Sequence, residues 1–197
     1  PNTAARKVPD RRRRPRAASV TALSDADYLV VGAGASGLAF VDALVEHDPD
    51  ALVEHDPDAR VVLVDRRDGV GGHWRAAYPF VRLHQSSTYR GGASTLLGRD
   101  RRQTDGPEAG LHERADQPTI LAYYDEVLRD RLLATGRVRL LTRCDFVGGR
   151  TVVSLETGER FEVPERCRVV DAHYLSPDVP AESPPPFVVD GADVVPA

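Results

Sequence analysis

Residues 27–37 read DYLVVGAGASG, and residues 60–65 read RVVLVD. Each segment contains four consecutive apolar residues, at 28–31 and 61–64, a pattern typical of strands that are buried on both faces of a parallel sheet. The first run leads directly into glycines at 32, 34 and 37, and the second ends on Asp65. This is the G-x-G-x-x-G pattern in its required context of strand, tight turn, helix, strand and terminal acid. The two segments therefore predict a βαβ unit that binds a dinucleotide.

Each position of this motif requires glycine for a separate physical reason. Gly32 permits the tight turn out of the strand, Gly34 lets the backbone approach a pyrophosphate, and Gly37 lets the helix pack closely on the strand. The N-terminus of the helix offers free N–H groups to the phosphates. Asp65 can accept hydrogen bonds from ribose hydroxyls. The alternative is a glycine-rich turn that binds nothing.

An exact repeat lengthens the connection between Gly37 and Asp65. The octapeptide ALVEHDPD occurs at 43–50 and again at 51–58, and removing one copy leaves an ordinary spacing of 19 residues. Pro49 cannot continue a helix without a cost of about 3 kcal/mol. We therefore expect the first helix to end near His47 or Asp48. Residues 50–55 of the second copy should form a short extra turn, remote from the phosphates.

Composition limits the classes of function. The chain has 197 residues, 41% of them hydrophobic and 28% charged, as expected of a soluble globular domain with its own core. Residues 1–20 carry a net charge of +6, whereas the other residues carry −10. The acidic charge of residues 21–197 argues against general binding to nucleic acid. No apolar run is long enough to span a membrane. The two cysteines are far apart, which argues against a redox disulfide or a metal site and favours a cytoplasmic location.

The sequence predicts a disordered Arg-rich tail at 1–24, followed by one domain at 25–197. After Asp65 comes a glycine-rich loop with Trp74, then FVRLHQ at 80–85 as a short strand, and then a long irregular connection at 86–117. Apolar residues at i, i+3 and i+4 predict a helix over 118–135, with Asp116 or Gln117 as its cap and Gly136 as its stop.

The segments after this helix predict mainly antiparallel structure. VRLLTRC at 138–144, DFVGGRTVVSLE with its turn at Gly148–Gly149, and RFEV after Gly158 form an expected meander. CRVVDA at 167–172 is a further short strand. The expected fold class is therefore α/β: a Rossmann-like domain with a parallel sheet plus an antiparallel β-meander.

The chain resembles the N-terminal, FAD-binding part of flavin-dependent monooxygenases and related FAD/NAD(P)-dependent oxidoreductases. The resemblance covers about residues 27–190 and rests on GAGASG, VVLVDRR, GGHW, YPFVRLHQ, AYYDEVL and YLSPDVP. It implies FAD as cofactor, with NAD(P)H a further cofactor of the complete protein, and a small-molecule substrate. By resemblance, the residues that contact FAD are Gly32, Gly34, Ser36, Gly37, Asp65, Arg66, Gly72, Trp74, Leu83, His84 and Gln85.

Two departures from the family pattern affect the functional expectation. The family usually shows Ala-Thr-Gly after its returning strand, where this chain has Asp171-Ala172-His173. These side chains either face a ligand or belong to a turn that is built differently. The sequence also has no second G-x-G-x-x-G, so we expect an incomplete domain, with no catalytic residue assigned. The alternatives are an NAD(P)-dependent dehydrogenase that uses the same site, or a truncated binding module without activity.

Overall fold

The structure is a computed structural model, and it describes residues 19–45, 58–92, 94–98, 101–173, 188 and 190–191. The repeat and the helix end predicted at His47 or Asp48 lie largely outside these residues, as do most of the N-terminal tail and YLSPDVP. Helix α1 is described from Ala35 to Val45.

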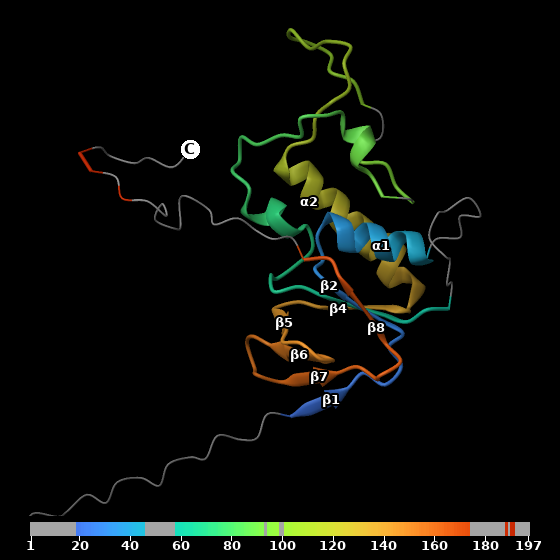
Figure 1. Cartoon of the computed structure of the whole chain (residues 1–197). Coiled ribbons are helices and arrows are strands. Elements are labelled where there is room, and N and C mark those ends of the chain that lie inside the picture. Colours follow the sequence, from blue (N-terminus) through green and yellow to red (C-terminus); the bar gives the residue numbers. More distant parts are fainter. Residues whose placement is uncertain are drawn as a thin grey trace, which may run out of the picture.

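Three layers make up the fold (Figure 1). A four-stranded parallel sheet lies in the middle, with α1 and α2 on one face and a second, four-stranded sheet on the other. The parallel sheet has the order β4-β3-β2-β8, from Val138–Leu141, Val61–Val64, Tyr28–Val31 and Arg168–Asp171. The second sheet has the order β1-β7-β6-β5, from Val20–Ala22, Arg160–Glu162, Thr151–Ser154 and Cys144–Phe146. The predicted α/β class, with a parallel sheet and a meander, is confirmed.

Burial on both faces explains the uninterrupted apolar strands. Every residue of β2 and β3 is buried. Alternate residues contribute to different cores, so that Tyr28 and Val30 pack towards the helices and Leu29 and Val31 pack towards the second sheet. The alternation follows from the two-residue period of a strand.

The predicted helix over 118–135 is present as a continuous helical run with changing geometry. It comprises α2 at Gln117–Glu126, a π-helical segment at Val127–Leu132 and a 3₁₀ turn at Leu133–Thr135. Asp116 is the N-cap, and its side chain accepts a hydrogen bond from the Thr119 N–H at 3.1 Å. Gly136 ends the run in the left-handed region, at φ 69°. Both predicted end signals are thus confirmed, and of the two cap candidates Asp116 is correct.

Three predictions about strands are wrong. VRLLTRC is not one strand of the meander: it splits into β4 of the parallel sheet and the start of β5, with the break at Arg143, whose φ is 50°. FVRLHQ forms no strand, only an isolated bridge between Arg82 and Asp116. The tail boundary at 24 is too late, because Val20–Ala22 forms β1 and pairs in parallel with β7. In the first and third cases the partner strand, and not the local sequence, decides the outcome.

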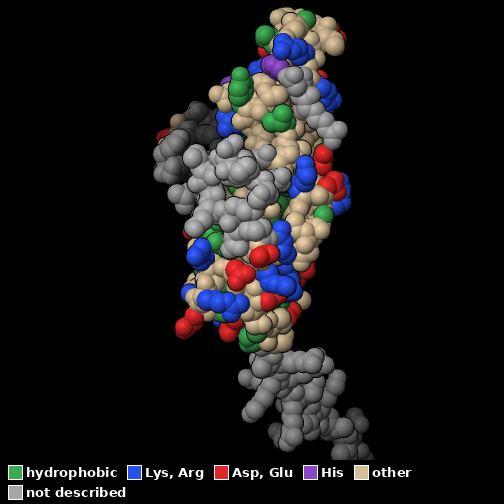
Figure 2. All heavy atoms as spheres, turned by 90° about the vertical axis from the view of Figure 1, so that its right-hand side faces the viewer, with side chains coloured by type: hydrophobic (Ala, Val, Ile, Leu, Met, Phe, Trp, Pro, Cys, Tyr) green, Lys and Arg blue, Asp and Glu red, His purple; other side chains and the backbone are tan. Residues whose placement is uncertain are grey.

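The connection from 77 to 116 is irregular, as expected. It contains the 3₁₀ turn Ser87–Arg90 and an antiparallel bridge between Arg102 and His112, and it projects from the helical layer (Figure 1). On the face drawn in Figure 2, arginine and acidic side chains are interspersed over the lower half, at the level of the second sheet.

Candidate functional site

The carboxyl ends of β2, β3 and β8 meet at one edge of the parallel sheet. Strand β2 has β3 on one side and β8 on the other, so the chain leaves β2 in one direction and returns later on the opposite side. In open α/β sheets, ligands bind outside the carboxyl ends of the strands at such a reversal of strand order. This topology indicates where a ligand site should lie, before any side chain is considered.

A cavity of about 430 Å³ lies at this edge. Its volume falls within the roughly 300–1,000 Å³ that is usual for small-molecule and cofactor sites. Its walls come from the glycine motif and α1, from β3 and the loop that follows it, from β5, and from the end of β8. The lining residues are Val31, Gly32, Gly34, Ala35, Ser36, Val64, Asp65, Arg66, Arg67, Gly72, His73, Cys144, Asp145, Phe146, Ala172 and His173.

The glycines of the motif are required by close backbone approaches. Gly32 has φ 106°, and a Cβ there would lie 2.7 Å from the Ala172 carbonyl oxygen. A Cβ on Gly37 would collide with the carbonyl oxygen of Gly32. Gly34 faces the loop after β3, and its Cβ would lie 3.5 Å from the Cα of Gly72. Gly32 and Gly37 therefore serve the packing of strand and helix, whereas Gly34 and Gly72 form a wall of bare backbone on the cavity.

Helix α1 begins at this wall with unshielded N–H groups. Its first turn, which contains Ala35 and Ser36, has no acidic side chain, and both residues line the cavity. The first N–H groups of a helix have no intrahelical partner and carry the positive end of the helix dipole. This arrangement favours a phosphate.

Asp65 is buried, with 7% of its surface exposed, and it holds the turn together. One carboxylate oxygen accepts a hydrogen bond from the Ala33 N–H at 2.8 Å, and the other accepts from the Arg67 N–H at 2.8 Å. An ionised carboxylate offers about four lone-pair positions, so acceptor capacity remains on the oxygens of this cavity residue. Asp65 can therefore fix the loop and still accept a hydrogen bond from a ligand hydroxyl.

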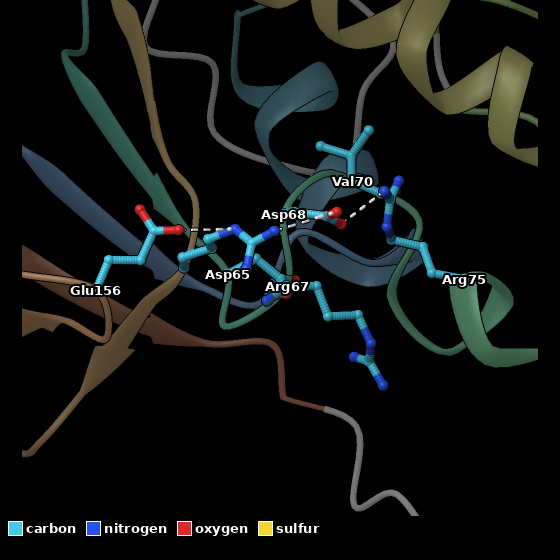
Figure 3. A network of polar contacts seen from close by, with 7 residues as sticks. Asp65, Arg67, Asp68, Val70, Arg75 and Glu156 are labelled. Atoms are coloured by element: carbon cyan, nitrogen blue, oxygen red, sulfur yellow. Dashed lines mark hydrogen bonds and ion pairs between the residues drawn. The ribbon is translucent and has the colours of Figure 1, made fainter.

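A network of ion pairs lies around the loop that carries Gly72 (Figure 3). The carboxylate of Asp68 lies 2.7 Å from a guanidinium nitrogen of Arg75 and 3.6 Å from one of Arg143, which also pairs with Glu156 at 3.2 Å. The Arg75 guanidinium holds the pKa of Asp68 below its usual value. The Gly71 N–H donates to the Ala33 carbonyl at 2.9 Å, so the loop is also tied to the glycine motif.

Two arginines, Arg66 and Arg67, line the cavity. Arg66 lies 3.6 Å from the carboxylate of Asp145 and is exposed. The Arg67 guanidinium points away from the ion-pair network in Figure 3 and makes no hydrogen bond or ion pair with the described residues. Partial burial and the charge of Arg67 lower the pKa of His73. With His73 neutral, the two arginines of the lining balance the two aspartates, Asp65 and Asp145.

The end of β8 contributes an Asp–His pair. The Asp171 carboxylate accepts from the His173 backbone N–H at 3.0 Å and lies 2.7 Å from His173 Nδ1. These contacts lower the pKa of Asp171. His173 lines the cavity, and its backbone nitrogen lies 3.3 Å from the position of a Cβ on Gly32. The departure from Ala-Thr-Gly is thus a turn built on its own side chains, one of which also faces the cavity.

The structure brings some of the predicted cofactor residues together. Gly32, Gly34, Ser36, Asp65, Arg66 and Gly72 line the cavity. Gly37 lies behind it, where it allows α1 to pack.

The other predicted contacts lie outside the cavity wall. Trp74 and Leu83 pack against the helix-side core, whereas His84 and Gln85 are exposed, and Gln85 accepts a hydrogen bond from Arg90. Cofactor contact by all these residues stays a prediction.

Several lining residues were missed by sequence reasoning. Cys144, Asp145 and Phe146 come from β5, which is adjacent to Asp65: the Cys144 N–H donates to the Asp65 carbonyl at 3.0 Å. No local pattern marked them, because the contact depends on how the two sheets pack. Arg67 and His73 could have been found, since each follows directly on a residue that the motifs had selected.

The match to a known family covers part of the site. Residues 30–104 match the family of NAD(P)-binding Rossmann-like domains. The matched segment includes the glycine motif, Asp65 and the Gly72 loop.

Similar proteins have been found by sequence and by structure. The uncharacterized proteins Rv2000 of Mycobacterium tuberculosis and Mb2023 of Mycobacterium bovis are each 42% identical over 172 residues, which cover 87% of this chain and 30% of theirs. The chain thus spans under a third of the length of these relatives.

Among solved structures, a flavin-containing monooxygenase from Stenotrophomonas maltophilia has a TM-score of 0.49 at 17% identity, covering 76% of this chain and 38% of its own. An oxidized steroid monooxygenase bound to NADP has a TM-score of 0.46 at 24% identity, covering 74% and 25%.

Two other kinds of site are not found in the described part of the chain. No described helix is long and apolar enough to cross a membrane. No group of three or more His, Cys, Asp or Glu side chains among the described residues could hold a metal ion. Cys144 and Cys167, both buried, are free thiols, and burial raises the pKa of each.

Proposed function

We propose that this chain is the FAD-binding portion of a monooxygenase-like flavin-dependent oxidoreductase. The observation that carries the proposal is the meeting of two motifs in one cavity: the GAGASG turn and the GGHW loop touch at Gly34 and Gly72. Both motifs belong to the resemblance with FAD enzymes.

The donor set fits the cofactor. In this proposal the start of α1 and the backbone at Gly34 and Gly72 hold the diphosphate, and Asp65 accepts from the adenosine ribose. The bound flavin supplies the redox chemistry, and the chain supplies binding, orientation and electrostatics. No described side chain is assigned as a catalytic residue. The substrate of the whole protein is a small molecule of unspecified class.

Flavin absorption of the purified chain tests this proposal directly. We expect yellow protein, or uptake of added FAD with a visible flavin spectrum and one equivalent bound. A colourless protein that takes up no added FAD would contradict the proposal.

A second candidate is an NAD(P)-dependent dehydrogenase with the same cavity. It is favoured by the family match at 30–104 and by the acid at Asp65, which suits a free ribose hydroxyl. Parallel titrations with FAD, NADH and NADPH separate the two candidates. Binding of NADH with no binding of FAD would support the dehydrogenase and contradict the flavoprotein. Binding of NADPH in preference to NADH would indicate that Arg66 or Arg67 accepts a 2′-phosphate.

A further inference from the structure

A second cavity, of about 290 Å³, lies at the amino ends of the parallel strands. Its walls come from the segment before β2, from the starts of β3 and β4, and from the end of the helical run that begins with α2. The cavity described above lies at the carboxyl ends of the same sheet. The four-residue strands separate the two by about 13 Å, so a small ligand in one cavity does not reach the other.

Three arginines give this second cavity a positive lining. Arg60, Arg137 and Arg139 line it, and Asp25 is the one acid among its lining residues. The carboxylate of Asp25 already pairs with Arg60, at 3.2 Å from Nη1. The formal charge of the lining is therefore +2, whereas the arginines and aspartates of the carboxyl-end cavity balance. We call this second site the arginine cavity.

Arg137 is the arginine of this cavity that most needs an opposite charge. Its side chain is half-buried, and Nη1 is fully buried without a hydrogen-bond partner. Neither Arg137 nor Arg139 forms an ion pair or a side-chain hydrogen bond with the part of the chain that the structure describes. Burial removes water from a charged group, and this cost is normally offset by an opposite charge or an acceptor. An anion against the guanidinium of Arg137 would supply both.

The backbone holds Arg137 and Arg139 in place. The Arg137 N–H donates to Thr135 Oγ1 at 3.1 Å, and its carbonyl accepts from the Val61 N–H at 3.0 Å. The second bond extends the pairing of β3 with β4 by one residue, and Arg139 is paired with Val62 in the same register. Because alternate residues of a strand point to the same side, Arg137 and Arg139 belong to one face of the sheet.

The size and the walls of the arginine cavity indicate the class of ligand. Its volume lies just under the roughly 300–1,000 Å³ of sites for larger cofactors, so it suits a small molecule and not a second dinucleotide. Arginine recognises phosphate and carboxylate oxygens through its parallel N–H donors. Aliphatic side chains of Val61, Val62, Val138 and Leu133 belong to the other lining residues, and they suit a short carbon skeleton.

We propose that the arginine cavity binds a small organic anion that carries a phosphate or carboxylate group, with Arg137 as its main contact. This proposal does not depend on FAD binding, because the two cavities lie at opposite edges of the sheet. The arginines come from the starts of two strands that are far apart in the sequence, so the site exists only in the folded chain. Binding should therefore also stabilise the fold.

The test is a titration of the full chain with inorganic phosphate, followed by proton–nitrogen correlation NMR at constant ionic strength. Acetate serves as the carboxylate probe, and the tighter of the two identifies the preferred group. We expect saturable shifts of the backbone amides of Arg60, Arg137 and Arg139. In R137Q, which keeps hydrogen-bond donors but loses the charge, the affinity should fall by at least about tenfold, as for the loss of a hydrogen bond to a charged group.

R129Q is the matched control, because it also removes one positive charge. Arg129 is exposed and pairs with Asp130 on the π-helical segment, so R129Q should bind phosphate as tightly as the wild type. If R137Q does not fold, as judged by circular dichroism, R139Q takes its place with the same expectation of weaker binding.

Three results would overturn the proposal. The first is the absence of saturable shifts at these amides with either anion up to about 50 mM. The second is wild-type phosphate affinity in R137Q, or in R139Q where R137Q does not fold. The third is a set of shifts confined to Gly34 and Ser36, which would place the anion in the carboxyl-end cavity. FAD titration separates this proposal from the proposed function: R137Q should bind FAD like the wild type, and a chain that binds phosphate at Arg137 but no FAD would contradict the flavoprotein alone.

Discussion

Two glycines of the motif, three residues apart, should respond differently to the same substitution. In Gly37→Ala, the new methyl group collides with the carbonyl oxygen of Gly32 and lies 3.1 Å from its carbonyl carbon. Gly32 is held at φ 106°, so this carbonyl cannot move without changing the turn. In Gly34→Ala, the nearest atom is the Cα of Gly72 at 3.5 Å, which is ordinary van der Waals contact.

The structure gives the expected magnitudes. Overpacking in a dense interior costs about 1–3 kcal/mol, and a backbone collision falls at the upper end. Alanine is better than glycine in a helix by about 1 kcal/mol, which offsets part of this cost. Gly37→Ala should therefore lose about 2 kcal/mol of folding free energy, or about 4–8 °C in Tm for a chain of this size. Gly34→Ala should change stability by less than about 1 kcal/mol.

For FAD affinity we expect the reverse: Gly34→Ala should have the larger effect of the two variants. The methyl group of Gly34→Ala stands on the wall where the backbone must approach a diphosphate, so we expect FAD affinity to fall by at least about tenfold. Thermal unfolding by circular dichroism without ligand measures the first effect, and FAD titration below the Tm measures the second. Each variant is the control for the other. A Gly37→Ala Tm within 1 °C of wild type would show that Gly37 is not needed for the packing of α1 on the strand. Unchanged FAD affinity in Gly34→Ala would show that the diphosphate does not approach the backbone at Gly34.

Three further predictions concern buried polar groups. Asp65→Asn replaces one of two carboxylate acceptors with an N–H group that faces a backbone N–H, so we expect a loss of about 1–3 kcal/mol in urea unfolding and weaker FAD binding; wild-type stability would contradict it. Burial raises the pKa of Tyr124 to about 12. The unfolded chain therefore loses its tyrosine proton first, and this contribution to stability, complete below about pH 10, is lost as the pH rises towards 12; a Tyr124→Phe variant should show a flatter fall in urea-unfolding free energy across this range. The thiols of Cys144 and Cys167, with pKa values raised by burial, should react slowly with a disulfide reagent at pH 8 and rapidly in denaturant, and bound FAD should slow Cys144 further; rapid reaction of the native protein would refute this.

The elements that sequence predicted well are those whose signals are local. The glycine motif, the apolar strands β2 and β3 and the helix capped by Asp116 each carry their evidence within a few residues. The pattern at 167–172 also predicted β8, although its place beside β2 could not be seen in it. These predictions succeeded because the chain meets the steric and hydrogen-bonding needs of each element within the element itself.

The errors arise where tertiary contacts decide. Nothing in VRLLTRC shows that its first half pairs with β3 while its second half belongs to another sheet. The division depends on Arg143, whose backbone N–H bonds to the Arg67 carbonyl at 2.9 Å. Val20 to Ala22 resembles the tail that precedes it, and only pairing with β7 makes it a strand. The β5 wall of the cavity was missed for the same reason.

The cavity is built from three segments that are far apart in the sequence, and the parallel sheet brings them together. Gly34, Gly72 and His173 belong to different connections, but each follows the carboxyl end of a parallel strand, so the sheet brings them to one edge. The exposed ion pairs of Asp68 are weakened by solvent and contribute little, and they act on a loop that is already tied to Ala33 by a backbone hydrogen bond. Loop position therefore depends mainly on backbone contact. For this reason, substitution at the glycines should impair the site more than removal of any one of these ion pairs.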